Sequence, residues 1–125
     1  MERLSAGEGI LYVEAVGHRV GGDLVVVIGG GTHPHVGAVA VAQPRPSLQG
    51  GGKISSSASV ITLLGHKEDE LARWAALLLA AELNTNVVVT AGLHVDHATP
   101  EQIRQLESTA RTLVKSLVER FRVTE

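Results

Sequence analysis

Runs of β-branched residues alternate with turn residues in the first half of the chain. Residues 10–20 and 23–28 are rich in valine and isoleucine, and Gly21 and Gly22 separate them. A glycine pair supplies the positive φ angles of a two-residue hairpin turn, so two antiparallel strands are predicted. Residues 24–28 are apolar without interruption. Such a strand is typical of a sheet covered on both faces, so we expect a layer on each side.

Two further strands are expected before the middle of the chain. Residues 36–42 form a third apolar run, which we expect to stop at Pro44 and Pro46 because proline donates no backbone hydrogen bond. Residues 59–64 form a fourth run. Between them, segment 47–57 is rich in glycine and serine and has few side chains that could pack. We therefore expect it to be the most mobile stretch.

The second half of the chain predicts two helices around a fifth strand. Residues 66–83 have acidic side chains in the first turn and are later apolar nearly all round, which predicts a central helix or one at a subunit contact. Residues 87–90 form the strand. The last helix starts at Thr99, an N-cap residue, and Gln102 completes a capping box. Apolar positions at steps of three and four then indicate a helix that packs on a sheet. They are Ile103, Leu106, Ala110, Leu113, Leu117 and Phe121.

The predicted order is four strands, a helix, a strand and a helix (ββββαβα). Hairpin connections between the first strands favour an α+β fold with a mostly antiparallel sheet over a doubly wound parallel sheet. The sequence has no internal repeat and no linker composition, so we expect residues 1–125 to form a single domain.

Composition excludes several classes of function. The formal net charge is -2, which gives no general attraction for nucleic acid or anionic lipid. Cysteine is absent, which excludes disulfides, thiolate metal sites and cysteine nucleophiles. No signal peptide and no membrane-spanning apolar run is visible, so we expect a cytoplasmic protein without nucleic-acid or membrane partners. Aromatic residues make up only 2%, so stacking is not expected to be the main way of holding a base or flavin ring.

Histidines are the strongest candidates for chemistry. Five of the six lie at the ends of predicted elements or in glycine-rich loops: His33, His35, His66, His94 and His97. If these ends fold onto one rim, the imidazoles could bind a metal or donate to an anion. Neither the pair around Pro34 nor segment 94–97 has the helical spacing of a zinc hydrolase, so we expect no metal. Each histidine, taken singly, could instead bond nearby backbone.

Segment 50–55 resembles a phosphate-binding loop only in part. Ser47 stands at the first-glycine position of that loop and Ile54 at its hydroxyl position, so the match fails. A weaker possibility is one phosphate bound by charge and hydroxyl donors, and the alternative is a solvated loop. The donors would be Arg45, Lys53, Ser55, Ser56 and Ser57. Dinucleotide and hydrolase motifs are absent, and we expect no catalytic residue.

Four segments together resemble a known family. They read GTHPHVGAVA, PRPSL, GHKED and AGLHVD, and they occupy residues 31–40, 44–48, 65–69 and 91–96. In this order they resemble the prenylated-flavin chaperone family, also known as the small D subunit of gallate decarboxylase. The resemblance extends from about the first strand to the last helix.

The resemblance implies a non-catalytic accessory protein. It would bind prenylated FMN, or FMN, and help to load or activate a UbiD-like decarboxylase of aromatic acids. It also implies a fold like that of proteasome-assembly-chaperone domains, which usually pair, so we expect a homodimer or a higher homo-oligomer. By position, the proposed phosphate ligands are Arg45, Lys53, Ser55 and Ser56. The proposed ligands of the ring or its polar edge are His33, His35, His66, His94 and His97.

Two other functions remain open at this point. The histidines could serve a small metal-dependent enzyme, which would contain stoichiometric metal and lose function with a chelator. The glycine-rich loops and the apolar helix could instead belong to an assembly subunit that binds a decarboxylase and never a flavin. The sequence identifies neither the decarboxylase nor its substrate.

Overall fold

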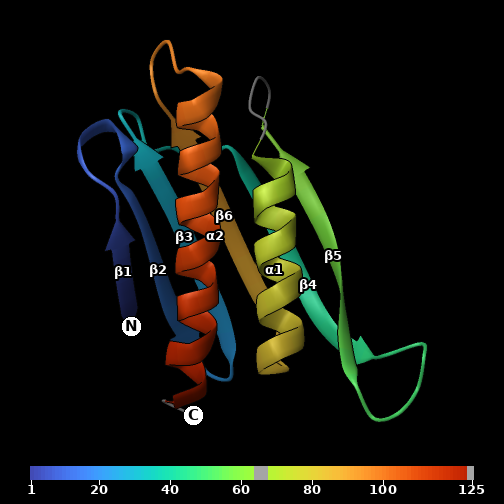
Figure 1. The fold of residues 1–125 in the computed structure, drawn as a ribbon. Coiled ribbons are helices and arrows are strands. Elements are labelled where there is room, and N and C mark those ends of the chain that lie inside the picture. Colours follow the sequence, from blue (N-terminus) through green and yellow to red (C-terminus); the bar gives the residue numbers. More distant parts are fainter. Residues whose placement is uncertain (64–67, 124–125) are drawn as a thin grey trace.

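A computed structural model describes residues 1–63 and 68–123 of the chain. Within these ranges the chain forms a six-stranded sheet with two helices on one face (Figure 1). The α+β class with a mostly antiparallel sheet is confirmed. The elements in chain order are β1 (Glu2–Ala6), a 3-10 turn (Gly9–Leu11), β2 (Val13–Val20), β3 (Asp23–Gly31), β4 (Ala38–Pro46), β5 (Ile54–Thr62), α1 (Asp69–Leu83), β6 (Val87–His94) and α2 (Pro100–Val123).

Strand order across the sheet is β1-β2-β3-β6-β4-β5. The β3–β6 pair is parallel, and the other neighbouring strands are antiparallel. Because β6 lies between β3 and β4, the chain that joins those two strands has to cross the end of β6. We call residues 32–37 the crossing segment.

Glycine makes this crossing possible. A Cβ atom at Gly92 on β6 would overlap the carbonyl oxygen of His35, so the crossing backbone lies directly against the strand. Gly31 enters the crossing with a φ of 82°, a conformation that side chains disfavour. Backbone bonds then fix the segment, because the N–H of Thr32 donates to the carbonyl of His94 at 2.7 Å and that of Gly37 to Ala91 at 3.0 Å.

The core lies between the sheet and the two helices. On β3, Leu24, Val26 and Ile28 alternate with less buried residues and face the helices. On β4 the buried positions are Ala38, Ala40 and Ala42, and the buried side of α1 is also rich in alanine. Small side chains on both surfaces let this helix pack closely on the sheet.

Helix α2 agrees with its sequence prediction. The N–H of Gln102 donates to Thr99 Oγ1 at 3.1 Å, and the N–H of Thr99 donates to Gln102 Oε1 at 3.0 Å, which is the expected capping box. Five of the six predicted apolar positions are buried, whereas Ile103 remains 50% exposed. Helix α1 is also confirmed from Asp69 onward, and the predicted residues 66 and 67 lie outside the described ranges.

All five strand predictions were wrong in their extent. Strand β2 begins at Val13 and not at residue 10, and β3 continues three residues beyond the predicted end at residue 28. Strand β4 continues through Pro44 and Pro46, because its pairing with β6 ends at Ala42 and a missing N–H is tolerated where a strand has one neighbour. Strand β5 begins at Ile54, so the serines assigned to a mobile loop pair with β4. Strand β6 extends four residues beyond the predicted end at residue 90. Strand β1 was not predicted.

Layers on both faces of the sheet were also predicted, and the described chain has only one. Both helices lie on the same side of the sheet (Figure 1). Side chains on the other face are open to solvent, with Val27 49% and Val41 51% exposed. The apolar run of β3 therefore has no second layer from the described part of its own chain.

Replacing Gly92 by alanine tests the crossing. The Cβ atom would displace the backbone at His35, so we expect G92A to lower the free energy of unfolding by at least about 2 kcal/mol. The matched control is G22A in the β2–β3 turn, where an added Cβ has no atom within 4 Å and the expected change is below about 0.5 kcal/mol. Urea unfolding measures both, and equal effects would contradict the close contact.

Candidate functional site

Three of the predicted histidines meet at one end of the sheet. His33 and His35 lie on the crossing segment, and His94 is the last residue of β6. The rings of His33 and His94 stack with centroids 5.7 Å apart, and the ring of His35 lies 6.4 Å from that of His94, edge to face. The crossing over β6 is what brings residues some sixty positions apart into contact. We call these three residues the histidine cluster.

Asp96 holds two members of the histidine cluster. Its Oδ1 lies 3.0 Å from His94 Nε2, and its Oδ2 lies 3.1 Å from His33 Nε2. These hydrogen bonds, that with His94 first and that with His33 second, lower the pKa of the Asp96 carboxyl from its ordinary value of 3.8. All three side chains are at least half exposed, so the arrangement is open to a ligand.

Glu68 joins the start of α1 to the histidine cluster. Its Oε1 lies 3.1 Å from His35 Nε2, in a pair whose side chains are only 21% and 13% exposed, and also accepts the N–H of Leu93 at 3.3 Å. Nδ1 of His35 donates to the carbonyl of His33 at 3.0 Å, because a carbonyl oxygen only accepts. Oε2 of Glu68 is buried and has no hydrogen-bond partner among the residues that the structure describes.

A cavity of about 370 Å³ adjoins the histidine cluster. It lies between the start of α1, the end of β6 and the first turns of α2, and its walls are mostly apolar. His94 and Glu68 belong to both the cavity and the contacts described above. Ile103, the exposed exception on α2, stands at its wall. The lining residues are Glu68, Leu71, Leu93, His94, Val95, Ala98, Ile103, Leu106 and Glu107.

The other predicted ligands do not join the histidine cluster. Arg45, Lys53, Ser55 and Ser56 lie at the opposite end of the β4–β5 pair, and Arg45 is seven residues along β4, or about 24 Å from its start. Nε of Arg45 donates to Ser57 Oγ at 2.9 Å, and the hydroxyl of Ser56 donates to the carbonyl of Leu77 on α1 at 2.8 Å.

The remaining two histidine predictions have different outcomes. His97 is exposed one residue after Asp96, with a left-handed φ of 53°. His97 is therefore close to the histidine cluster in sequence, but among the described residues its ring makes no contact with the rings of the cluster. His66 lies outside the described residues.

Glu68 and Asp96 were not predicted as site residues. Glu68 contacts His35 and Leu93, which are distant in sequence. Asp96 bonds to the nearby His94 and also to the distant His33, and only the fold brings the latter into reach. Both do fall in segments that resemble the prenylated-flavin chaperone family. The family resemblance of those segments was the sequence signal that could have identified Glu68 and Asp96 as site residues.

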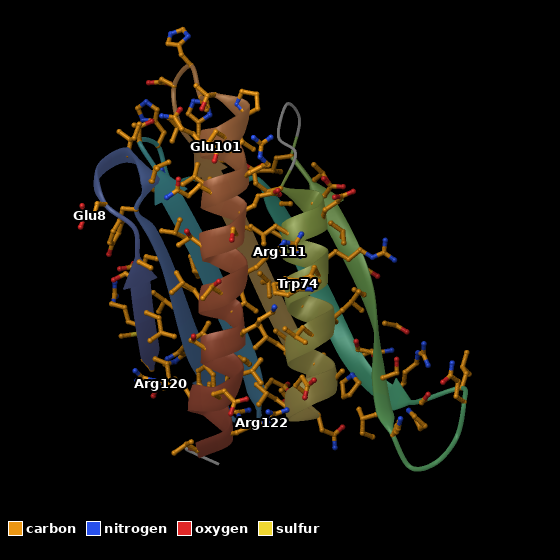
Figure 2. All side chains as sticks on the ribbon, viewed as in Figure 1. Glu8, Trp74, Glu101, Arg111, Arg120 and Arg122 are labelled. Carbon is orange, nitrogen blue, oxygen red and sulfur yellow. The ribbon has the colours of Figure 1, made fainter. Side chains whose placement is uncertain are left out.

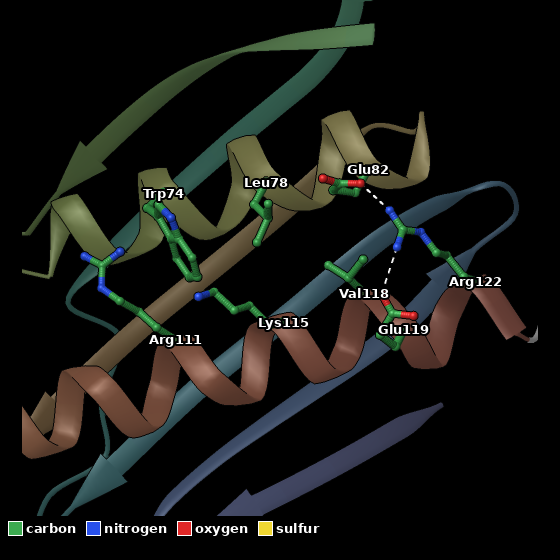
Figure 3. A pocket seen from close by; sticks show the side chains of 8 residues that line it. All are labelled: Trp74, Leu78, Glu82, Arg111, Lys115, Val118, Glu119 and Arg122. Atoms are coloured by element: carbon green, nitrogen blue, oxygen red, sulfur yellow. Dashed lines mark hydrogen bonds and ion pairs between the residues drawn. The ribbon is translucent and has the colours of Figure 1, made fainter. Parts of the chain in front are cut away.

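A second cavity, of about 530 Å³, lies between α1 and α2 (Figure 3). Its aromatic wall is already covered, because the guanidinium of Arg111 lies 4.6 Å from the centre of the Trp74 ring. Arg122 pairs with Glu82 and with Glu119, the latter at 2.8 Å. Arg120 and Arg122 lie at the end of α2 remote from Glu101 (Figure 2). One face of the Trp74 ring is therefore already occupied by a guanidinium of the same chain.

Residues 1–63 and 68–123 contain neither a metal-binding group of side chains nor a membrane-spanning helix. No group of three or more histidine, aspartate or glutamate side chains in these ranges has the geometry to hold a metal ion. No helix described there combines the length and apolar character needed to cross a membrane.

Comparison with known proteins identifies the family. Residues 7–122 match the model of the prenylated flavin chaperone LpdD-like domain. The chain belongs to this family. The resemblance inferred from the sequence is thus confirmed, and no curated protein is significantly similar to the chain. Of the four family-like segments, residues 31–40 and 91–96 and the described part of 65–69 meet at the histidine cluster. The fourth, residues 44–48, lies at the opposite end of β4.

The Asp96 carboxyl provides a test of the histidine cluster. We expect its titration midpoint, followed by carboxyl carbon NMR, to lie below 3.8, so any stability it contributes is lost only as the pH falls through that lowered pKa. H94A should raise the midpoint more than H33A does, because the His94 hydrogen bond is the larger cause. A midpoint unchanged in both variants would show that the hydrogen bonds are absent in solution.

Proposed function

We propose that this chain binds prenylated FMN at the histidine cluster and the adjoining cavity, and delivers it to a UbiD-like decarboxylase without catalysing a reaction itself. The observation that carries the proposal is an apolar cavity whose wall includes the imidazole of His94, in a member of the prenylated flavin chaperone family. The proposal includes FMN as a related ligand and a homodimer or higher homo-oligomer as the working form.

The cavity suits the ring system of a prenylated flavin. Leu71, Leu93 and Leu106 supply apolar walls for the isoalloxazine and the ring derived from the prenyl group. The polar edge of a flavin carries N–H donors and carbonyl acceptors. Imidazoles of the histidine cluster can donate to the carbonyls, and Oε2 of Glu68, which has no partner among the described residues, can accept a flavin N–H.

The phosphate of the flavin needs a separate place. Among the described residues, the cavity wall contains two carboxylates, Glu68 and Glu107, and no lysine or arginine. A phosphate dianion would be repelled there, so it has to lie outside the cavity. We propose the exposed imidazoles of His33 and His97 for this role within one chain. Binding by Arg45, Lys53, Ser55 and Ser56 would instead require those residues from a second copy, since they lie at the far end of the sheet.

A carrier has to release its ligand. The polar groups available to the flavin are few, and those of His33, His94 and Asp96 are half or more exposed, which limits how tightly the ligand is held. An enzyme has to stabilise a transition state selectively, whereas a carrier that only hands over its ligand does not. The modest polar content of the site is therefore consistent with a carrier.

Native mass spectrometry after co-expression with a flavin prenyltransferase tests the site. The unmodified chain should carry one prenylated FMN per protomer. H94A should lower the bound fraction about fivefold, as expected for one lost hydrogen bond, and I103E about tenfold or more because it adds a third carboxylate to the wall. K53A is the control and should bind as the unmodified chain does. Loss in K53A alone would move the site to the β4–β5 turn, and no adduct in any chain would reject flavin binding.

Delivery is tested separately by activation of a UbiD-like decarboxylase purified without cofactor. Flavin-loaded chaperone should restore decarboxylation faster than the same concentration of free prenylated FMN. H33A, with its fold checked by circular dichroism, should activate several-fold more slowly, because the His33 ring stacks on His94, which lines the cavity. Activation that is equal with and without the chaperone would leave a binding protein that does not deliver.

A further inference from the structure

The second cavity between α1 and α2 continues the line of the cavity proposed for the flavin. The flavin cavity reaches Leu71 on α1 and Glu107 on α2, and the second one begins about one helical turn further along each helix, at Trp74 and Arg111. We call this second space, of about 530 Å³, the interhelical groove. Its lining residues are Trp74, Leu78, Glu82, Arg111, Lys115, Val118, Glu119 and Arg122.

The charges of the interhelical groove are paired at one end only. Arg122 pairs with both carboxylates of the groove, Glu82 on α1 and Glu119 on α2 (Figure 3). Arg111 and Lys115 lie towards the other end, and neither has a carboxylate partner among the residues that the structure describes. The end next to the flavin cavity therefore carries two unpaired cations, on a chain whose formal net charge is -2.

The dimensions of the interhelical groove match those of a short helix. The groove extends over residues 74–82 of α1 and 111–122 of α2, which is about 12 to 17 Å at about 1.5 Å per residue. Leu78 and Val118 supply apolar surface between its charged ends. A helix of about eight to eleven residues has this length, and its apolar side chains at steps of three and four would face the groove.

The spacing of the two unpaired cations selects the charge of that helix. Arg111 and Lys115 are four residues apart, so they lie on the same side of α2. Two carboxylates one turn apart on a partner helix have the same spacing, and each can pair with one cation. A basic helix would be repelled at these positions. The surface therefore favours a helix with an apolar side and carboxylates beside it.

We propose that the interhelical groove binds an acidic amphipathic helix of the decarboxylase that receives the flavin. The identity of this partner rests on the proposed function, because a helix in the groove would end about one turn from the flavin cavity, where a recipient of the ligand has to be. The groove and the flavin cavity share no lining residue, so the chain can hold the flavin and the partner together.

Binding to a UbiD-like decarboxylase purified without cofactor, measured by biolayer interferometry, tests the groove. K115E should bind at least about tenfold more weakly than the unmodified chain, because it places a carboxylate against a carboxylate of the partner. The control is S116E, which adds a carboxylate one residue further along α2, where Ser116 lies beside Leu4 and Ser5 of β1. It should bind as the unmodified chain does. No binding by the unmodified chain, or equal binding by K115E, would overturn the proposal.

Flavin content separates this proposal from the proposed function. K115E should carry as much prenylated FMN in native mass spectrometry as the unmodified chain, because Lys115 does not line the flavin cavity. A chain that binds the decarboxylase through Lys115 but takes up no flavin would reject the proposed function and support the groove. Loss of flavin from K115E would place the flavin in the groove and overturn the proposal.

A synthetic peptide tests the chemistry of the partner without a variant of the chain, so its outcome does not depend on how K115E folds. The probe is a helical peptide of about eleven residues with leucines along one side and two glutamates one turn apart. It should displace the decarboxylase from the unmodified chain. The same peptide with lysines in place of the glutamates should require at least about a tenfold higher concentration. Equal displacement by the two peptides would overturn the preference for an acidic helix.

Discussion

The position of β6 between β3 and β4 is the constraint on which the rest of the structure depends. Because the chain has to cross the end of β6, residues 32–37 lie against it, and Gly92 leaves room for the carbonyl of His35. The same crossing brings His33 next to His94 and sets His35 against Glu68. The histidine cluster is thus a product of strand order, and residues without chemistry, such as Gly92, are as necessary to it as the imidazoles.

Local signals in the sequence predicted local structure well. The glycine turn between β2 and β3 and the capping box at Thr99 involve residues close in sequence, and both formed as expected. The ends of β4 and β5 depended on which neighbours each strand has, which the sequence does not state. The sequence also indicated that the histidines could come together at one edge of the fold, because they lie at the ends of predicted elements. The contacts of Glu68 and Asp96 depend on the crossing of β6, and Arg45 was grouped with the histidines although β4 carries it to the other end of the sheet.

Mapping the bound flavin by NMR tests the central claim most directly. Amide and methyl signals would be recorded while prenylated FMN is added to the full chain. The account predicts the largest shifts at Leu93, His94, Val95 and Ile103, where the cavity meets the histidine cluster. Shifts concentrated at Arg45 and Lys53, or around Trp74 in the groove between the helices, would contradict it.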